Sequence, residues 1–133
     1  MGDGMETLAE IRGSTGEPGT LGLGDGVIRD FLESDPSLSR AIDEASDNFQ
    51  SLKGDLGSKL FEMAETDLVS ELQSDYVNFY KAPTVNPYVA IAARGPWIIT
   101  SHGAVLHDNG AYGTLGKGHG PDDVIHSMQQ NWV

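Results

Sequence analysis

Apolar residues recur at steps of three and four positions in the stretch after Asp35, and this is the clearest periodic pattern in the chain. Asp35 can accept backbone N–H bonds as an N-cap, and Pro36 suits the first helical position. Gly54 and Gly57 flank an interruption of the pattern. We therefore predict a helix that starts at Asp35 and ends near Gly54, with a buried face of Leu38, Ala41, Ile42, Ala45, Phe49 and Leu52.

A second amphipathic stretch covers residues 58–80. Thr66 can cap a restart, which would divide this stretch into two shorter helices. Such a pattern is more typical of helices that pack on a core or on a partner subunit than of a cofactor site. The predicted polar side holds Glu62, Glu65, Ser70 and Gln73, and the apolar side holds Leu60, Phe61, Ala64, Leu68, Leu72, Tyr76 and Phe79.

The pattern changes after Pro83 and Pro87, which favour an extended connection. Residues 88–93 and 97–101 have the composition of strands, and Val105 and Leu106 begin a third. The Asn109-Gly110 pair that follows favours a tight hairpin turn. A small antiparallel β-meander is expected here.

A last helix is expected to open at Pro121, where Asp122 and Asp123 suit the positive end of the helix dipole. Neither a C-capping glycine nor another stop signal follows, and the apolar face has no obvious partner within the chain. We therefore expect the chain to be cut here or to continue elsewhere. The predicted buried face consists of Val124, Ile125, Met128 and Trp132.

The first 26 residues contain eight glycines and Pro18 without sustained periodicity, which predicts a flexible glycine-rich arm. Residues 27–81 are then acidic amphipathic helices. Residues 82–133 hold the β-meander, a glycine-rich loop and the last helix. The fold class predicted from this order is α+β.

The formal net charge of −12 lies entirely in the first part of the chain, which has seventeen acidic and five basic residues through Asp75, against three of each afterwards. Such a surface repels phosphate backbones and anionic lipids, so we expect neither nucleic-acid nor membrane binding. No cysteine is present, which excludes disulfides and thiolate chemistry. Without a signal peptide or a long apolar run, a cytoplasmic protein is expected.

The glycine-rich run 110–120 does not match a phosphate-binding motif. A Walker loop requires a glycine where Ala111 stands and Ser or Thr where Gly118 follows Lys117. A dinucleotide-binding fingerprint requires an acidic residue about twenty positions later, and the chain ends first. The glycines favour a loop that lines a site or an interface, although a flexible connector stays possible.

The four histidines do not form a metal-binding pattern such as HxH, HExxH or a facial triad, so no metal is predicted. His119 is expected to form a hydrogen bond near the start of the last helix. His102, His107 and His126 are expected on the sheet surface. No Gly-x-Ser-x-Gly elbow is present, and the neighbouring Ser101 and His102 do not constitute a catalytic triad.

Residues 103–133 carry a recognisable order of features: a strand ending in Leu106-His107-Asp108, a turn at Gly110, Tyr112, and Gly118-His119-x-Pro121-x-x-Val124 opening a helix. This order resembles class III pyridoxal-phosphate-dependent aminotransferases, near the start of their chains. The closer spacing of Asp108 and Gly110 and the shorter segment 112–118 indicate a divergent branch. The resemblance implies the N-terminal segment of a fold-type I pyridoxal-phosphate enzyme.

The resemblance also implies a function. The complete enzyme would be a transaminase with pyridoxal phosphate as cofactor, but the lysine, aspartate and phosphate-binding segment that hold it lie downstream in the family. The lysines of this chain match none of these motifs, so no catalytic or cofactor-binding residue is assigned and the chain alone is expected to be inactive. It would contact the remainder of the enzyme and a second subunit in a homodimer. Substrate-pocket residues would be Tyr112, Thr114 and Leu115, and turn and helix-start residues Gly118, His119 and Pro121.

Two other functions stay open from the sequence alone. The acidic helices and the meander could form a stand-alone interaction or dimerisation module without catalysis. A small enzyme with its own site would require a pocket with converging titratable groups, which the sequence does not indicate.

Overall fold

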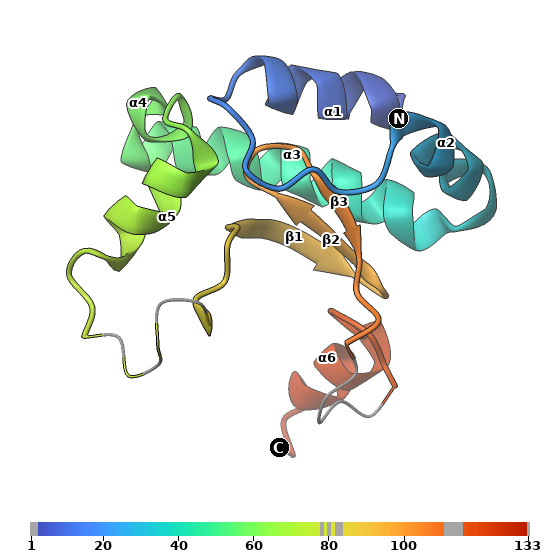
Figure 1. Cartoon of the computed structure of the whole chain (residues 1–133). Coiled ribbons are helices and arrows are strands. Elements are labelled where there is room, and N and C mark those ends of the chain that lie inside the picture. Colours follow the sequence, from blue (N-terminus) through green and yellow to red (C-terminus); the bar gives the residue numbers. More distant parts are fainter. Residues whose placement is uncertain (1–2, 78, 80, 82–83, 111–115, 133) are drawn as a thin grey trace.

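The computed structural model describes residues 3–77, 79, 81, 84–110 and 116–132 of the chain. Within these residues the fold is α+β, as predicted (Figure 1). The elements in chain order are α1 (Gly4–Gly13), α2 (Asp25–Ser34), α3 (Pro36–Leu56), α4 (Ser58–Phe61), α5 (Glu65–Gln73), β1 (Ala90–Arg94), β2 (Trp97–Thr100), β3 (Val105–His107) and α6 (Asp122–Met128).

Helix α3 is the central element of the fold, and its predicted N-terminus is confirmed. Asp35 is the N-cap, its side chain accepts a hydrogen bond from the Ser37 amide, and Pro36 opens the helix. Its end lies close to the predicted one, since the helix continues two residues past Gly54 to Leu56 and ends at Gly57, which has φ of 87°. A single glycine inside a helix costs only about 1 kcal/mol, which the packing of the preceding turns offsets. The buried face holds Leu38, Ala41, Ile42, Ala45 and Phe49.

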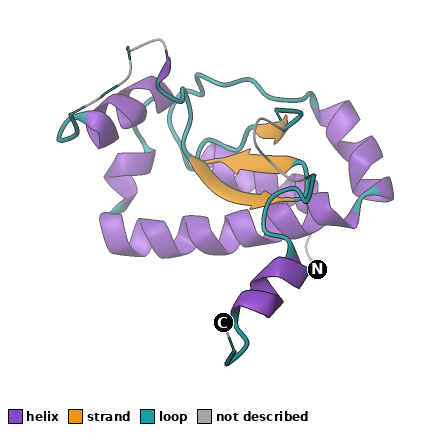
Figure 2. Ribbon diagram, turned by 90° about the horizontal axis from the view of Figure 1, so that it is seen from below, coloured by secondary structure: helices purple, strands orange, loops and turns teal. Residues whose placement is uncertain are grey.

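The three strands form the predicted antiparallel meander in the order β1-β2-β3, and α3 lies across one face of this sheet (Figures 1 and 2). Trp97 and Ile99 belong to the core cluster shared with α3. Because side chains alternate along a strand, Ile98 points to the opposite face, together with its cross-strand partners Ala93 and Leu106. The second face of the sheet is therefore also apolar.

The prediction of a flexible arm over residues 1–26 is wrong. Asp3 caps helix α1, whose Leu8 and Ile11 are buried in the core cluster. A ten-residue helix is marginal in isolation, but packing on α3 stabilises it. The segment after α1 is also held in place by backbone hydrogen bonds. The Gly16 amide donates to Phe61 O at 3.0 Å, and the Leu23 amide donates to Val105 O at 2.9 Å.

The stretch predicted as a helix over residues 58–80 is divided into α4 and α5, and α5 ends at Gln73. Several expectations for its faces are wrong. Leu72, expected on the apolar face, is 39% exposed. Tyr76 and Phe79 are exposed, because they lie beyond the end of α5. Glu65, expected on the solvent side, is fully buried. Hydrogen bonds to its Oε2 from the Gly19 and Thr20 amides, at 2.9 and 2.7 Å, offset part of the cost of burying the carboxylate.

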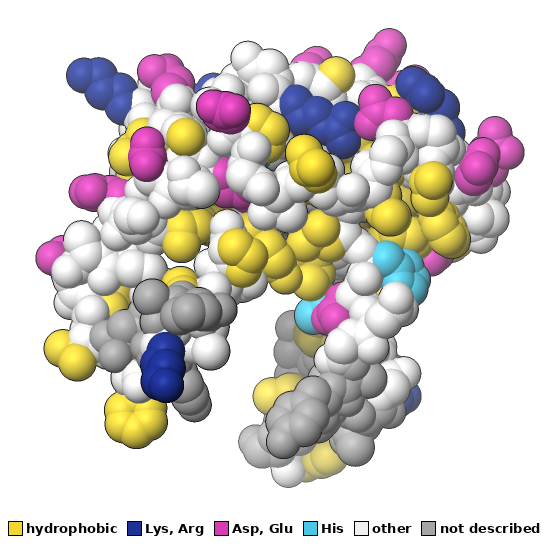
Figure 3. Space-filling model, in the orientation of Figure 1, with side chains coloured by type: hydrophobic (Ala, Val, Ile, Leu, Met, Phe, Trp, Pro, Cys, Tyr) yellow, Lys and Arg dark blue, Asp and Glu magenta, His cyan; other side chains and the backbone are white. Residues whose placement is uncertain are grey.

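Helix α6 follows Pro121 as predicted, but its expected burial is wrong. Val124, Ile125, Met128 and Trp132 are all exposed, Trp132 to 77%. In Figure 3 the α6 region projects from the body of the molecule, opposite a second projection formed by the α5 region. The helix is attached through polar contacts at its N-terminal end rather than through its apolar face. None of the helices in the described part of the chain is long and apolar enough to cross a bilayer.

Candidate functional site in the glycine-rich hollow

A hollow of about 450 Å³ lies between the β1–β2 turn and the ends of the glycine-rich loop. Its polar side chains come from both ends of that loop, Asp108 and Asn109 at one end and Lys117 and His119 at the other. The complete lining within the described residues is Gly95, Pro96, Asp108, Asn109, Gly110, Gly116, Lys117, Gly118 and His119.

Backbone hydrogen bonds hold the two ends of the loop against the β1–β2 turn. Gly95 and His119 exchange both of their backbone bonds, at 3.0 and 2.8 Å, and the Asp108 amide donates to Pro96 O at 2.7 Å. Gly118 makes this approach possible, since it has φ of 69° and a Cβ there would lie 2.8 Å from the Gly95 backbone. The position of the loop ends is thus set by the sheet.

The Asp108 carboxylate is the most highly connected group in the hollow. Its Oδ1 accepts the Gly110 amide hydrogen, and its Oδ2 pairs with His119 Nε2, each at 2.8 Å. The hydrogen bond from Gly110, followed by that from His119, lowers the pKa of Asp108 below its ordinary value. The hollow therefore contains a carboxylate that is ionised at neutral pH, paired with an imidazole.

His119 lies at the base of the loop rather than at the helix cap. The predicted hydrogen bond near the start of the last helix is replaced by the bond to Asp108. Lys117, two residues earlier, pairs with Asp123 in the first turn of α6 at 2.6 Å, and this bond lowers the pKa of Asp123. Both basic side chains of the hollow therefore have a carboxylate partner.

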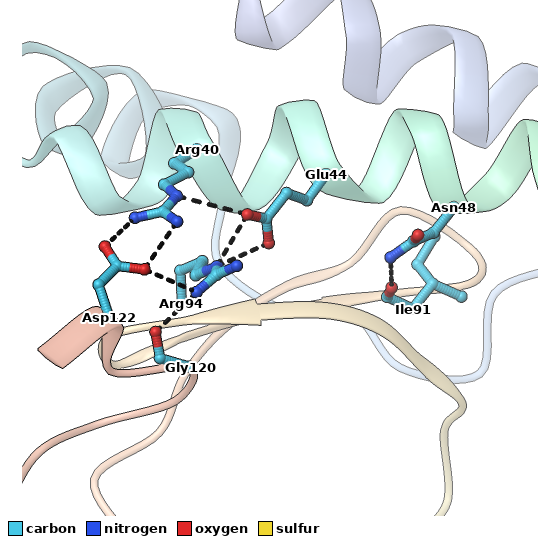
Figure 4. A network of polar contacts seen from close by, with 7 residues as sticks. All are labelled: Arg40, Glu44, Asn48, Ile91, Arg94, Gly120 and Asp122. Atoms are coloured by element: carbon cyan, nitrogen blue, oxygen red, sulfur yellow. Dashed lines mark hydrogen bonds and ion pairs between the residues drawn. The ribbon is translucent and has the colours of Figure 1, made fainter. Parts of the chain in front are cut away.

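A network of two arginines and two carboxylates fixes the start of α6 on α3 and β1 (Figure 4). The Arg94 Nε donates to the Glu44 carboxylate at 2.7 Å, and its Nη1 donates to Gly120 O at 2.6 Å. Arg40 donates to Asp122 at 2.9 Å through Nη2, which lowers the pKa of Asp122. Arg94 is only 19% exposed and joins three elements, so it is the central residue of this network.

The residues predicted for the substrate pocket, Tyr112, Thr114 and Leu115, lie outside the described residues. Gly118 and His119 line the hollow, and Pro121 immediately precedes α6. The pairing of Asp108 with His119 and that of Arg94 with Glu44 were not predicted from the sequence. Neither pair has a periodic signal, because the partners are eleven residues apart in one case and fifty in the other.

A second hollow, of about 340 Å³, lies where the segment 15–25 crosses the end of the sheet, and Arg12 and His102 line it. The expected surface position of His102 is wrong, since only 2% of this residue is exposed. Its Nε2 bonds to Met63 O at 2.9 Å and its Nδ1 to the Ser101 hydroxyl at 3.0 Å. Because a carbonyl only accepts, Nε2 carries the hydrogen. Ser101 is fully buried, so this pair serves packing rather than nucleophilic chemistry.

The described residues fit neither a metal site nor a pyridoxal phosphate site. No group of three or more His, Asp or Glu side chains in the described ranges is placed to hold a metal ion. Lys117 lines the hollow, but it is 56% exposed and its amine is paired with Asp123. A lysine that condenses with the cofactor aldehyde must present a free amine in a closed site.

Comparison with protein-family models, with curated proteins and with solved structures finds no match to this chain.

Proposed function

We propose that the chain is the N-terminal part of a class III pyridoxal-phosphate-dependent aminotransferase, which transfers an amino group between an amino acid or amine and a 2-oxo acid. The proposal starts from the sequence resemblance of residues 103–133. Its structural support is the uncovered apolar face of α6, directly after the glycine-rich loop. Clustered apolar side chains at a surface are typical of a face that another chain or domain covers.

In this proposal the chain shapes the site without holding the cofactor. Bound pyridoxal phosphate would supply an electron sink for the reaction, and its ligands would come from outside this segment. The residues of this chain would position the loop: Asp108 and His119 close its base, and Arg94 fixes the start of α6. The loop would then contribute to the substrate pocket and α6 to the interface with the second subunit.

The test is to express the gene through its natural stop codon and to examine the purified product. We expect a longer protein that shows the visible absorbance of bound pyridoxal phosphate and converts a 2-oxo acid into an amino acid when supplied with an amino donor. A stop codon directly after Val133, with no separately encoded remainder, would contradict the proposal.

A stand-alone interaction module is the second candidate, and one observation favours it. Residues of α1, α2, α3 and the three strands share a continuous core, including Leu8, Ile28, Phe49, Trp97 and Val105. A segment with its own core can fold alone. Cooperative unfolding of the 133-residue chain, self-association in light scattering and no uptake of pyridoxal phosphate would together support this function.

A further inference from the structure

The first residues of the glycine-rich loop bring three reactive groups together. Asn109 is followed by Gly110, which has no side chain to shield its backbone nitrogen, and both residues are exposed. The Gly110 amide hydrogen is directed at Asp108 Oδ1 over 2.8 Å. We propose that Asn109 is a site of self-catalysed deamidation, in which Gly110 N attacks the Asn109 side-chain amide and Asp108 accepts the proton.

The position of Asp108 suits a general base. A base must lie within about 2.6–3.2 Å of the atom from which it takes a proton, and the Gly110 nitrogen meets this condition. Asp108 cannot readily turn away, since His119 Nε2 holds its other oxygen at 2.8 Å and its own amide is bonded to Pro96 O. Its lowered pKa keeps it in the carboxylate form at neutral pH.

The reaction is balanced with water as the only other reactant. A bond forms between Gly110 N and Asn109 Cγ, and the bond between Cγ and Nδ2 breaks. The proton that leaves Gly110 N passes through Asp108 to the departing nitrogen, which is released as ammonia. Water then opens the resulting five-membered imide at either carbonyl, giving aspartate or isoaspartate at position 109.

The other asparagines with a described structure provide internal controls. Asn48 is followed by Phe49, and its Nδ2 is occupied by a 2.7 Å bond to Ile91 O (Figure 4). Asn86 is followed by Pro87, whose nitrogen has no hydrogen to lose. Asn131 is followed by the bulky Trp132. Among these residues, only Asn109 combines an unshielded nucleophile with a carboxylate acceptor.

The modification would change the charge of the hollow. A neutral amide that lines it beside Lys117 and His119 would become a second carboxylate next to Asp108. Isoaspartate would in addition insert one backbone atom at the start of the loop. These consequences do not depend on the proposed aminotransferase function, because they follow from residues within this chain.

The experiment is to incubate the purified chain at neutral pH and to follow each asparagine by peptide mapping and mass spectrometry. We expect Asn109 to be converted faster than Asn48 or Asn131, with isoaspartate detectable by enzymatic methylation. Conversion in the folded protein should be faster than in the same protein unfolded in urea, because only the fold holds Asp108 in place. Gly110→Ala should slow the conversion strongly.

The role of the base is tested with Asp108→Asn, with Asp123→Asn as matched control in the same region. We expect Asp108→Asn to lower the rate of Asn109 deamidation about tenfold. This loss is smaller than the loss on removal of a typical general base, because a carboxylate is a weak base toward an amide. Asp123→Asn should leave the rate unchanged, and circular dichroism should confirm that both variants fold. Equal deamidation rates at Asn109 and Asn48 would contradict the proposal that Asn109 is a preferred site. Slower conversion of Asn109 in the folded than in the unfolded protein would show that Asp108 does not act as the base. It would then follow that the hydrogen bond from the Gly110 amide to Asp108 protects Asn109 from deamidation.

Discussion

The indole nitrogen of Trp97 donates a hydrogen bond to Asp35 Oδ2 at 2.8 Å, across sixty-two residues of sequence. Asp35 therefore has two roles, because its other oxygen caps helix α3 through the Ser37 amide at 2.9 Å. Trp97 is fully buried and meets Phe31 edge-on, with ring centroids 4.9 Å apart. One carboxylate thus links the start of the main helix to the first residue of β2.

Replacement of Asp35 by alanine is expected to lower the free energy of unfolding by about 1–3 kcal/mol, because it removes a helix cap and leaves a buried indole N–H without an acceptor. Urea denaturation followed by circular dichroism measures this. Asp47→Ala, at an exposed position of the same helix, is the matched control and should change little.

The same carboxylate predicts a pH dependence. Bonds from Ser37 and Trp97 lower the pKa of Asp35 in the folded state. Its contribution to stability is therefore complete above the unfolded pKa of about 3.9 and is lost as the pH falls from there through the folded pKa. Asp35→Asn should lack this part of the acid dependence. Parallel stability curves for Asp35→Asn and the wild type between neutral and acidic pH would contradict the assignment.

Arg94 and Arg40 are expected to differ although both belong to one ion-pair network. Arg94→Leu should destabilise the protein by about 1–3 kcal/mol, since it leaves Gly120 O without its side-chain donor and leaves the partly buried Glu44 with only the 3.4 Å contact to Arg40. It should also increase hydrogen exchange in α6. Arg40→Leu removes contacts of a more exposed side chain with Asp122 and Glu44 and should have little effect on stability. Equal effects of the two substitutions would show that Arg94 is not the central residue.

Two glycine substitutions should act in opposite directions. A Cβ on Gly16 would lie 2.2 Å from Met63 O, a backbone atom that cannot yield, so Gly16→Ala should destabilise severely. Gly54 lies inside α3 with nothing within 4 Å of such a Cβ, so Gly54→Ala should add about 0.5–1 kcal/mol. Thermal unfolding of both variants beside the wild type gives the comparison.

Removal of the His119 side chain should raise the pKa of Asp108. The bonds from Gly110 and His119 both lower this pKa, and His119→Ala removes the second of them. Carboxyl carbon NMR over an acidic pH series follows the titration directly. Lys117→Gln is the control, because Lys117 pairs with Asp123 instead, and it should leave the Asp108 titration unchanged.

The sequence predicted those elements whose determinants are local. Helix α3 and the meander have their periodic patterns, caps and turns within a few neighbouring residues. Helix α1 was missed because its burial depends on α3, which begins more than twenty residues later. The burial of Glu65 could not be predicted either, since its donors, the Gly19 and Thr20 amides, lie more than forty residues upstream.

The hollow illustrates the same limit. Its glycines predicted a loop with tight turns. The pairing of Asp108 with His119, however, depends on the backbone hydrogen bonds that hold both ends of the loop against the β1–β2 turn. The apolar face of α6 was recognised as a face from its spacing. The sequence offered no partner for this face within the chain, and the face is uncovered in the structure. The pattern alone does not identify what covers such a face, because it is the same for a helix that packs on its own chain and for one that packs on another chain.

The attachment of α1 to the end of the sheet has a consequence for synthesis on the ribosome. Arg12 Nε donates to Gly103 O at 2.9 Å across ninety-one residues, and Leu23 binds Val105. These contacts cannot form until the third strand has been translated and has left the exit tunnel. Helix α1 packs mainly on α3, which is synthesised before the strands. We therefore expect α1 to pack on α3 during synthesis and to gain its bond to the end of the sheet only after the third strand has emerged.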